Sequence, residues 1–361
     1  MVGSLGCCHA RSMPEESDSL EVLAAELTSW GETRELSGAM LLTRGGERIF
    51  EACVGYADRA TRTPVTPATR FGIASVTKMF TACTVVSLVR DGLVAFETPV
   101  VDVLPPDRRP STLLPSVTMH HLLCHTSGIA DYCEEDEDSP AYLADYADLW
   151  SELPSYSLTR PADFLPLFGD LAPYRPPGEL FQYSNAGYLV LGLVVEELTG
   201  RPFTEVVQGR VLDPAGMSAS GFFRLDEPVP DVAVGYRREA PDGPWRSNVY
   251  SIPVVGGADG GAICTARDLD RFLRAYTNGS LLGPLREVVL TRHASWDDGR
   301  GEGYGVHLYP DGRYGHGGGD PGVEALAYRW PQDDVHLVVL INTEVGLAVE
   351  VRDAMIAVWR G

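Results

Sequence analysis

The stretch Phe71-Gly-Ile-Ala-Ser75-Val-Thr-Lys78-Met-Phe80 places a serine three residues before the only lysine of this 361-residue chain. Lysine and arginine together number 29, so every other residue of that set is an arginine. A lysine can lose its proton near neutral pH when its surroundings lower its pKa, whereas an arginine does not. Because residues three apart share one face of a helix, the spacing predicts a lysine base acting on a serine nucleophile. The pattern is short, and chance is the alternative.

The elements around this stretch predict the sheet and its helices. The Ser75 segment is expected to be a helix ending at Asp91-Gly92. Before it, residues 38–43 and 48–54 have the pattern of an antiparallel hairpin. Near the other end of the chain, strand patterns occur at 324–330 and 335–342, and a closing helix is expected at about 347–359. Apolar residues at helical spacing form the buried stripe of the Ser75 helix: Met79, Phe80, Cys83, Val86 and Val89.

The middle of the chain differs in composition from both ends. Residues 96–254 are rich in proline, tyrosine and acidic residues, and their clearest helix pattern is 186–199, with Asn185 as the expected N-cap. We therefore predict an α/β (α+β) fold, in which an antiparallel sheet flanked by helices carries an inserted, mostly helical lobe. The first lobe would comprise residues 19–95 plus 255–361 and the second 96–254, with the active site in the cleft between them. Residues 1–18 lack the apolar core of a secretion signal and are expected to be a disordered leader.

Charge and cysteine usage exclude several classes of partner. The net charge of −21 disfavours nucleic acids and anionic membranes, and no apolar run is long enough to span a bilayer. The seven scattered cysteines favour a reducing compartment, so a cytoplasmic location is expected. No metal-ligand spacing, P-loop or dinucleotide fingerprint occurs, so no cofactor is expected. Cys124-His125 is a poor Cys/His dyad because the two residues are adjacent, and His125 is expected to brace the turn at 126–128.

Two further motifs follow the Ser-x-x-Lys pattern in order. They are Tyr183-Ser-Asn185 and His316-Gly-Gly-Gly319, the second lying just before the strand expected at 324–330. Together the three motifs resemble those of the serine beta-lactamase and penicillin-binding-protein superfamily, specifically the class C beta-lactamase-related branch with its esterases and D-aminopeptidases. The Leu-Leu-Cys-His-Thr-Ser-Gly segment at 122–128 and the turn at 174–179 are also similar to that family. The resemblance extends from about residue 38 to 342 and implies a beta-lactamase/transpeptidase-like fold.

The resemblance implies a serine hydrolase that forms an acyl-enzyme on Ser75. At the start of a helix, Ser75 lies where free N–H groups stabilise an oxyanion, although a plain N-cap serine is the alternative. Either Lys78 or Tyr183 could take its proton, and the sequence leaves this choice open. For Tyr183 the alternative is a buried aromatic residue. Asn185 could bind a substrate amide or serve only as an N-cap.

The third motif points to the substrate class. His316 and Gly317 stand where beta-lactamases usually have lysine and threonine, which favours esters, amides or small peptides over penicillins. Gly318 and Gly319 would let the backbone approach the substrate, with the Gly319 N–H as second oxyanion donor; a histidine in a tight glycine turn is the alternative. We predict hydrolysis of a small ester or amide, with weak activity on beta-lactams. Acyl transfer, or ligand sensing without turnover, are the alternative functions.

Overall fold

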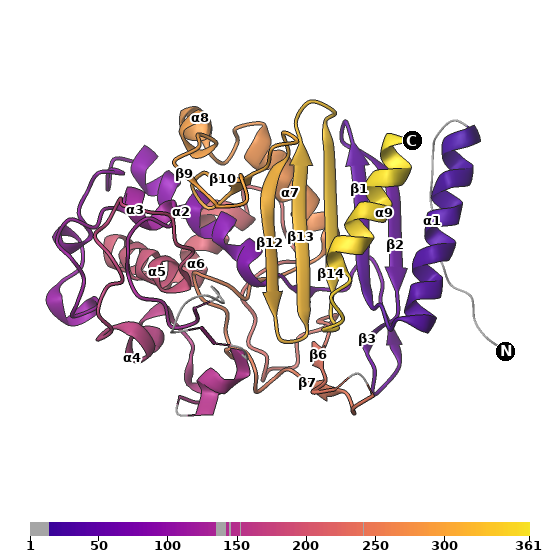
Figure 1. Ribbon diagram of the computed structural model, residues 1–361, viewed down its shortest axis with the longest axis horizontal. Helices are drawn as coiled ribbons and strands as arrows, with labels where there is room; N and C mark the ends of the chain where they lie inside the picture. The colour runs from indigo at the N-terminus through magenta and orange to yellow at the C-terminus, as the bar shows by residue number, and fades with distance from the viewer. Residues whose placement is uncertain (1–13, 135–141, 144–145, 152, 241) are drawn as a thin grey trace.

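The structure is a computed structural model that describes residues 14–134, 142–143, 146–151, 153–240 and 242–361. Its α-helices are α1 (Pro14–Thr33), α2 (Thr77–Arg90), α3 (Met119–Leu123), α4 (Leu165–Phe168), α5 (Asn185–Thr199), α6 (Phe203–Val207), α7 (Ala266–Thr277), α8 (Arg286–Val289) and α9 (Ala348–Arg360). Figure 1 shows α9 in front of the molecule's large sheet, α1 beside the edge strand β2, and α2, α3, α5 and α6 gathered on the other side of the sheet.

That sheet has eight strands in the order β2-β1-β14-β13-β12-β11-β10-β9, and each neighbouring pair is antiparallel. Its strands are β1 (Gly38–Arg44), β2 (Glu47–Val54), β9 (Ala294–Ser295), β10 (Gly301–Glu302), β11 (His307–Leu308), β12 (Tyr314–Asp320), β13 (Val323–Trp330) and β14 (Val335–Ile341). The short strands outside it are β3 (Tyr56–Asp58), β4 (Thr63–Pro64), β5 (Phe71–Gly72), β6 (Tyr236–Arg237), β7 (Arg246–Ser247) and β8 (Ile263–Cys264). β1 pairs with both β2 and β14, so the two ends of the chain complete one sheet.

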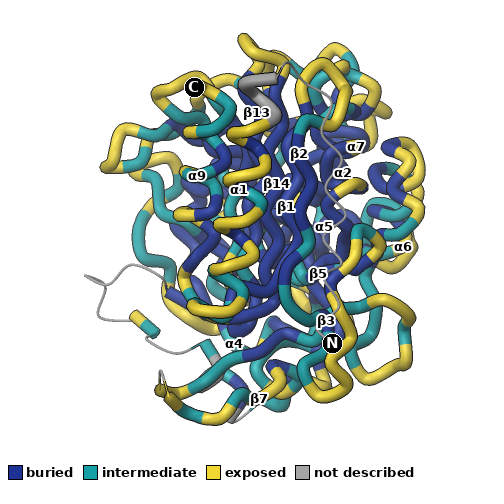
Figure 2. The backbone as a smooth tube through the Cα atoms, turned by 90° about the vertical axis from the view of Figure 1, so that its right-hand side faces the viewer, coloured by how far each residue is buried: buried dark blue, intermediate teal, exposed yellow. Residues whose placement is uncertain are grey.

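Both faces of the sheet are buried, because its central strands β13 and β14 carry apolar side chains toward both faces. Successive residues of a strand point to opposite faces. On β13, Leu326 and Tyr328 pack in a cluster with α1 and α9, whereas Ala325 and Ala327 pack in a cluster with α2, α5 and α7. Figure 2 shows α1 and α9 side by side over the buried strands, with exposed residues along their outer sides. The second cluster continues from the sheet into the middle of the chain and anchors α2 against α5.

The predicted fold class, the β1–β2 hairpin and the closing helix are confirmed. The helix α1 begins at Pro14, so residues 14–18 of the expected disordered leader are helical; a proline is well suited to the first position of a helix. The rest of the expected leader, residues 1–13, and most of the acidic stretch at 134–138 lie outside the described residues. The division into two lobes stays a prediction. Among the described helices, none has the length and apolar character that crossing a membrane requires.

Candidate active site

Ser75 lies in a short 3-10 turn, η1 (Ala74–Val76), which leads directly into α2. The residue before it, Ala74, has a φ of 43°, in the left-handed region that residues with a Cβ rarely adopt. This turn aims a partly exposed Ser75 into a pocket of about 620 Å³. The strand β12 lies against the same turn. The serine is therefore at the surface of a cavity, while the residues on both sides of it are buried.

One glycine of β12 allows the strand to approach Ser75, and the next one lines the pocket. A Cβ added to Gly318 would lie 2.5 Å from the Ile73 carbonyl oxygen and 2.9 Å from the Ser75 nitrogen, so only glycine fits. At Gly319 an added Cβ would meet nothing within 4 Å, and this residue lines the pocket. Gly318 thus allows β12 to lie close against the turn that carries Ser75, whereas the predicted approach of this glycine run to a substrate stays a prediction.

Lys78 is fully buried on the first turn of α2, and its ammonium faces Ser75. Its Nζ lies 3.0 Å from Ser75 Oγ, 2.7 Å from Asn185 Oδ1 and 2.6 Å from the carbonyl oxygen of Asp259. The Nζ also lies 4.8 Å from the centre of the Tyr183 ring. The structure therefore brings all three predicted catalytic residues, Ser75, Lys78 and Tyr183, together around one amine.

Tyr183 is held by a histidine that we expected only to brace a turn. The His125 ring stacks on the Tyr183 ring at 4.5 Å between centroids, and its Nδ1 accepts the Ser184 N–H at 3.0 Å. The His125 carbonyl also accepts the Gln182 N–H at 2.8 Å. Burial, and then the nearby charge of Lys78, holds the pKa of His125 well below its usual range, so the ring is neutral. His125 thus fixes the backbone on both sides of Tyr183.

Asn185 is the first residue of α5 and not its N-cap, which corrects the sequence-based expectation. The N-cap is Ser184, whose side chain accepts the Gly187 N–H at 3.0 Å. The buried carboxylate of Asp131 takes the two preceding helix amides, those of Asn185 at 2.6 Å and Ala186 at 3.0 Å. Because Ser184 and Asp131 bind the helix amides, the Asn185 side chain does not cap the helix. It contacts Lys78 instead and also lines the pocket.

His316 lies on β12 itself, so the third motif is part of a strand and not the segment before one. Pairing with β13 along its whole length overrides the weak strand preference of its glycines. The His316 side chain is buried, its Nδ1 lies 2.5 Å from the Gly317 carbonyl oxygen, and its Nε2 lies 2.9 Å from His307 Nε2. Burial, and then Lys78, lowers the pKa of His316 to about 3. At neutral pH this ring therefore brings no positive charge to Tyr183.

Three residues that support the site were not found from the sequence. Asp131 acts on a helix 54 residues away, His307 acts through the pairing of β11 with β12, and no local pattern marks either residue. Asp259 binds Lys78 through its backbone, while its carboxylate accepts the Tyr132 hydroxyl at 2.5 Å. By contrast, burial raises the pKa of the Cys124 thiol to about 11, so this group is inert at neutral pH.

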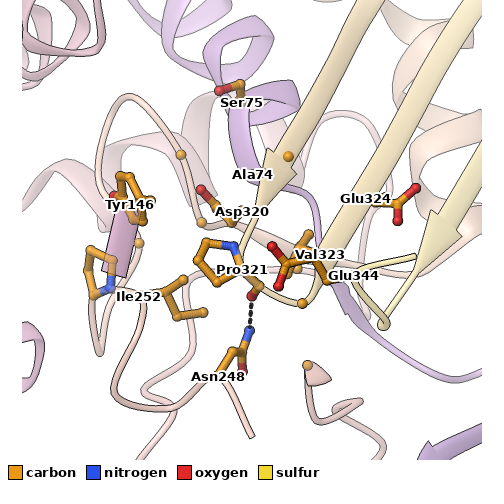
Figure 3. Close-up of a pocket in the computed structure, with 18 of the residues that line it drawn as sticks. Ala74, Ser75, Tyr146, Asn248, Ile252, Asp320, Pro321, Val323, Glu324 and Glu344 are labelled. Atoms are coloured by element: carbon orange, nitrogen blue, oxygen red, sulfur yellow. Dashed lines mark hydrogen bonds between the residues drawn. The ribbon is translucent and has the colours of Figure 1, made fainter. Parts of the chain in front are cut away.

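The pocket beside Ser75 has apolar walls and an acidic far end. Figure 3 shows Asp320 and Tyr146 on the pocket side of Ser75, with Glu344 farther away. Arg237 also lines it and lies 3.9 Å from a carboxylate oxygen of Glu344. Aromatic and aliphatic side chains form much of the remaining wall: Tyr132, Leu143, Phe164, Phe223, Leu225, Val232 and Ile252.

The sequence that folds into this site matches a known protein family. The family model described as Beta-lactamase matches residues 23–358. The chain belongs to the beta-lactamase family. A solved penicillin-binding protein from Bacillus halodurans is 41% identical with a TM-score of 0.84, and the match covers 92% of this chain and 99% of that one. A D-stereospecific amidohydrolase from Streptomyces sp. is 26% identical with a TM-score of 0.75, over 94% of this chain and 98% of that one.

An esterase is also among the relatives. Esterase EstB of Burkholderia gladioli is 38% identical over 197 residues, which are 52% of this chain and 48% of the esterase. The chain spans between 48% and 80% of the length of the first curated relatives. The prediction of a beta-lactamase-related serine hydrolase is confirmed at the level of the family.

Proposed function

We propose that this protein hydrolyses a small ester or amide through an acyl-enzyme on Ser75, with Lys78 and Tyr183 moving the protons. The relatives include an esterase and an amidohydrolase, which supports both bond types. One observation carries the assignment of roles, the set of acceptors around the Lys78 amine.

Two of those acceptors orient the Lys78 amine toward Ser75. The Asn185 Oδ1 and the Asp259 carbonyl oxygen accept hydrogen bonds and cannot donate them, so they hold two N–H groups of Lys78. The remaining position of Nζ faces Ser75 Oγ at 3.0 Å. When Lys78 is neutral, its lone pair occupies that position and takes the serine proton as Oγ attacks the carbonyl carbon.

Tyr183 and the backbone complete the reaction. The oxyanion that forms as Oγ attacks would accept the N–H groups of Ser75 and Gly319, the residues at which η1 and β12 border the pocket. Tyr183, with its ring beside Lys78, would pass a proton to the leaving group and then activate a water molecule to release the acid. Tyr183 thus regains a proton from the attacking water, and Ser75 regains its own from Lys78 as the acyl group leaves, so every group is restored after one turnover.

The charge of the pocket favours substrates without a carboxylate. Three carboxylates, those of Asp320, Glu324 and Glu344, line it with one arginine, Arg237, so a negatively charged acyl group would meet an excess of like charge. At an effective dielectric constant near 20, a like charge about 7 Å away costs about 2 kcal/mol. Penicillins carry a carboxylate, so we expect neutral esters and amides to react faster than beta-lactams.

The test uses labelling and turnover with wild type and Ser75→Ala. A fluorophosphonate should add one adduct to wild type, seen by intact mass, and none to Ser75→Ala. p-Nitrophenyl butyrate should turn over, and a chromogenic cephalosporin should react more slowly. A wild type that neither gains the adduct nor turns over any ester would contradict the proposal.

The charge argument has its own test. The mono-p-nitrophenyl ester of glutarate, which carries a carboxylate, should have a kcat/KM at least about 10-fold below that of the butyrate, as about 2 kcal/mol implies. Asp320→Asn should narrow that gap, whereas Asp353→Asn on the exposed face of α9 is the matched control. An unchanged ratio in Asp320→Asn would show that this carboxylate does not select the substrate.

A further inference from the structure

A chain of hydrogen bonds runs behind β12, from the surface to the backbone of the glycine run. Arg300, whose side chain is 24% exposed, has its Nη1 3.4 Å from His307 Nδ1. The His307 Nε2 lies 2.9 Å from His316 Nε2, and the His316 Nδ1 lies 2.5 Å from the Gly317 carbonyl oxygen. Both histidines are buried, and no role in the reaction has so far been given to His307 or Arg300.

The two ends of this chain determine the position of each proton. A carbonyl oxygen only accepts, so His316 Nδ1 carries a proton and donates it to Gly317. The buried ring is neutral, so its Nε2 is bare and accepts from His307 Nε2. His307, also neutral because burial lowers its pKa well below the usual range, then has a bare Nδ1. That atom accepts from Arg300, which can only donate.

A competing acceptor near His307 does not break the chain. The carboxyl group of Glu302 is fully buried, and its Oε2 lies 3.9 Å from His307 Nε2, beyond hydrogen-bond distance. That oxygen accepts instead the Trp296 indole N–H at 2.9 Å. The His307 proton is therefore directed to His316.

The last bond of the chain acts on the strand that borders Ser75. In a β-strand, alternate residues direct their backbone groups to the same edge, so the Gly317 carbonyl and the Gly319 N–H share one edge of β12. The strand β11 pairs with β12 only at Tyr314 and Gly315. The glycines of β12 beyond Gly315 do not pair with β11. The His316 ring binds the Gly317 peptide instead of that strand.

We propose that His307 and Arg300 are positioning residues that fix the His316 tautomer and, through it, the orientation of the Gly317–Gly319 backbone. This inference rests on the proposed function, in which the Gly319 N–H stabilises the oxyanion. Because the His316 N–H binds the Gly317 carbonyl oxygen, the partial negative charge of that oxygen is offset beside the developing oxyanion. Loss of the His307 donor would free the His316 ring to turn and the peptide to move.

The tautomers can be observed directly. In wild type with ¹⁵N-labelled histidine, the ring signals should show His316 protonated at Nδ1 and bare at Nε2, and His307 protonated at Nε2 and bare at Nδ1. His316→Gln and His307→Gln assign the signals by their disappearance. A wild-type His316 protonated at Nε2 overturns the proposal, and this result does not depend on any activity.

Three variants test the effect on the reaction. His307→Leu removes the donor and should lower kcat, and the rate of fluorophosphonate labelling, by about 10-fold or more with KM little changed, because the oxyanion exists only beyond the ground state. His307→Gln keeps an amide N–H and should stay within about 3-fold of wild type. Arg300→Met, at the surface end, should lose about 3-fold. His293→Gln, a partly buried histidine outside the chain, is the control and should keep full activity.

The outcomes separate this inference from the function on which it rests. Equal rates for folded His307→Leu and wild type would overturn it, as would a His307→Gln variant as slow as His307→Leu. If wild type itself shows neither labelling nor turnover, the proposed function fails, and the ¹⁵N tautomers still decide whether the directed chain exists.

Discussion

Two chains of hydrogen bonds in the sheet begin at an arginine and pass through buried histidines, and they end on different acceptors. On β14, His336 Nε2 accepts from Arg329 at 2.5 Å, and His336 Nδ1 donates to Asp270 at 2.8 Å. On β12, the chain from Arg300 through His307 ends at the Gly317 carbonyl. The first ends on a carboxylate and the second on the neutral backbone.

The two chains of hydrogen bonds should therefore control different properties, one the stability of the fold and the other the orientation of a peptide. In the β14 chain, a histidine bridges two opposite charges, so removing it leaves both charges buried and less well paired. Asp270 also accepts from Thr43 and Arg274, which ties α7 to the sheet. The β12 chain ends on a peptide beside the nucleophile, and its main effect should be on where that peptide points. We therefore expect the β14 chain to control unfolding and the β12 chain to control the reaction rate.

The largest effect should come from the one buried cation that can release its proton. Lys78→Arg keeps the charge near Asn185 and Asp259 but removes the base, so fluorophosphonate labelling of Ser75 should slow by about 10³-fold, equivalent to about 4 kcal/mol. Arg90→Lys on the same helix is the control, and circular dichroism checks that both variants fold. A folded Lys78→Arg protein with normal labelling would show that proton transfer does not need this lysine.

The next largest effect should come from a variant that breaks the β14 chain of hydrogen bonds. His336→Leu leaves Asp270 and Arg329 buried without their bridge, so the free energy of unfolding should fall by about 3 kcal/mol. Denaturant titration measures it. The labelling rate of the remaining folded protein should be unchanged, the reverse of what we expect for His307→Leu. Similar losses of stability in both variants, with similar labelling rates, would remove the distinction between the two chains.

Features that depend on neighbouring residues could be predicted from the sequence, whereas features that depend on residues far apart in the sequence could not. The contact between Lys78 and Ser75 depends on helical spacing, and the β1–β2 hairpin depends on Gly45-Gly46, so both could be predicted from neighbouring residues. The strand β12 was missed because glycines such as Gly318 have little intrinsic strand preference, and pairing with β13 supplies what they lack.

Contacts between residues that lie on separate elements could not be predicted for the same reason. Asp131 binds the start of α5 from 54 residues away, and no pattern near Asp131 in the sequence indicates that contact. His307 lies nine residues from His316, yet their bond depends on the pairing of β11 with β12. The motif identified His316 as important, but its neutral, buried state follows from the packing around it.

Acid should weaken the β14 chain in a defined pH range. Burial opposes ionisation of Asp270, but hydrogen bonds from His336 and Thr43 outweigh it and lower the pKa to about 2. A carboxyl group with a lowered folded-state pKa contributes stability above its unfolded value near 3.9, and this is lost as the pH falls toward 2. The contribution is about 2 kcal/mol. In Asp270→Asn, the free energy of unfolding should therefore change less between pH 5 and about pH 2 than in wild type; an identical acid dependence would contradict the assignment.

The smallest effect lies at the turn that presents Ser75. Ala74 has a φ of 43°, and its Cβ makes this left-handed conformation cost about 1 kcal/mol. Ala74→Gly should remove that strain and raise the melting temperature by a few degrees at most, because glycine also gains freedom in the unfolded chain. If the strain serves to hold Ser75 against β12, the same variant should label more slowly with fluorophosphonate despite its greater stability. A gain of stability without a loss of rate would mean that the turn is held by its neighbours Gly260 and Gly318 alone, and that the strain at Ala74 has no part in the reaction.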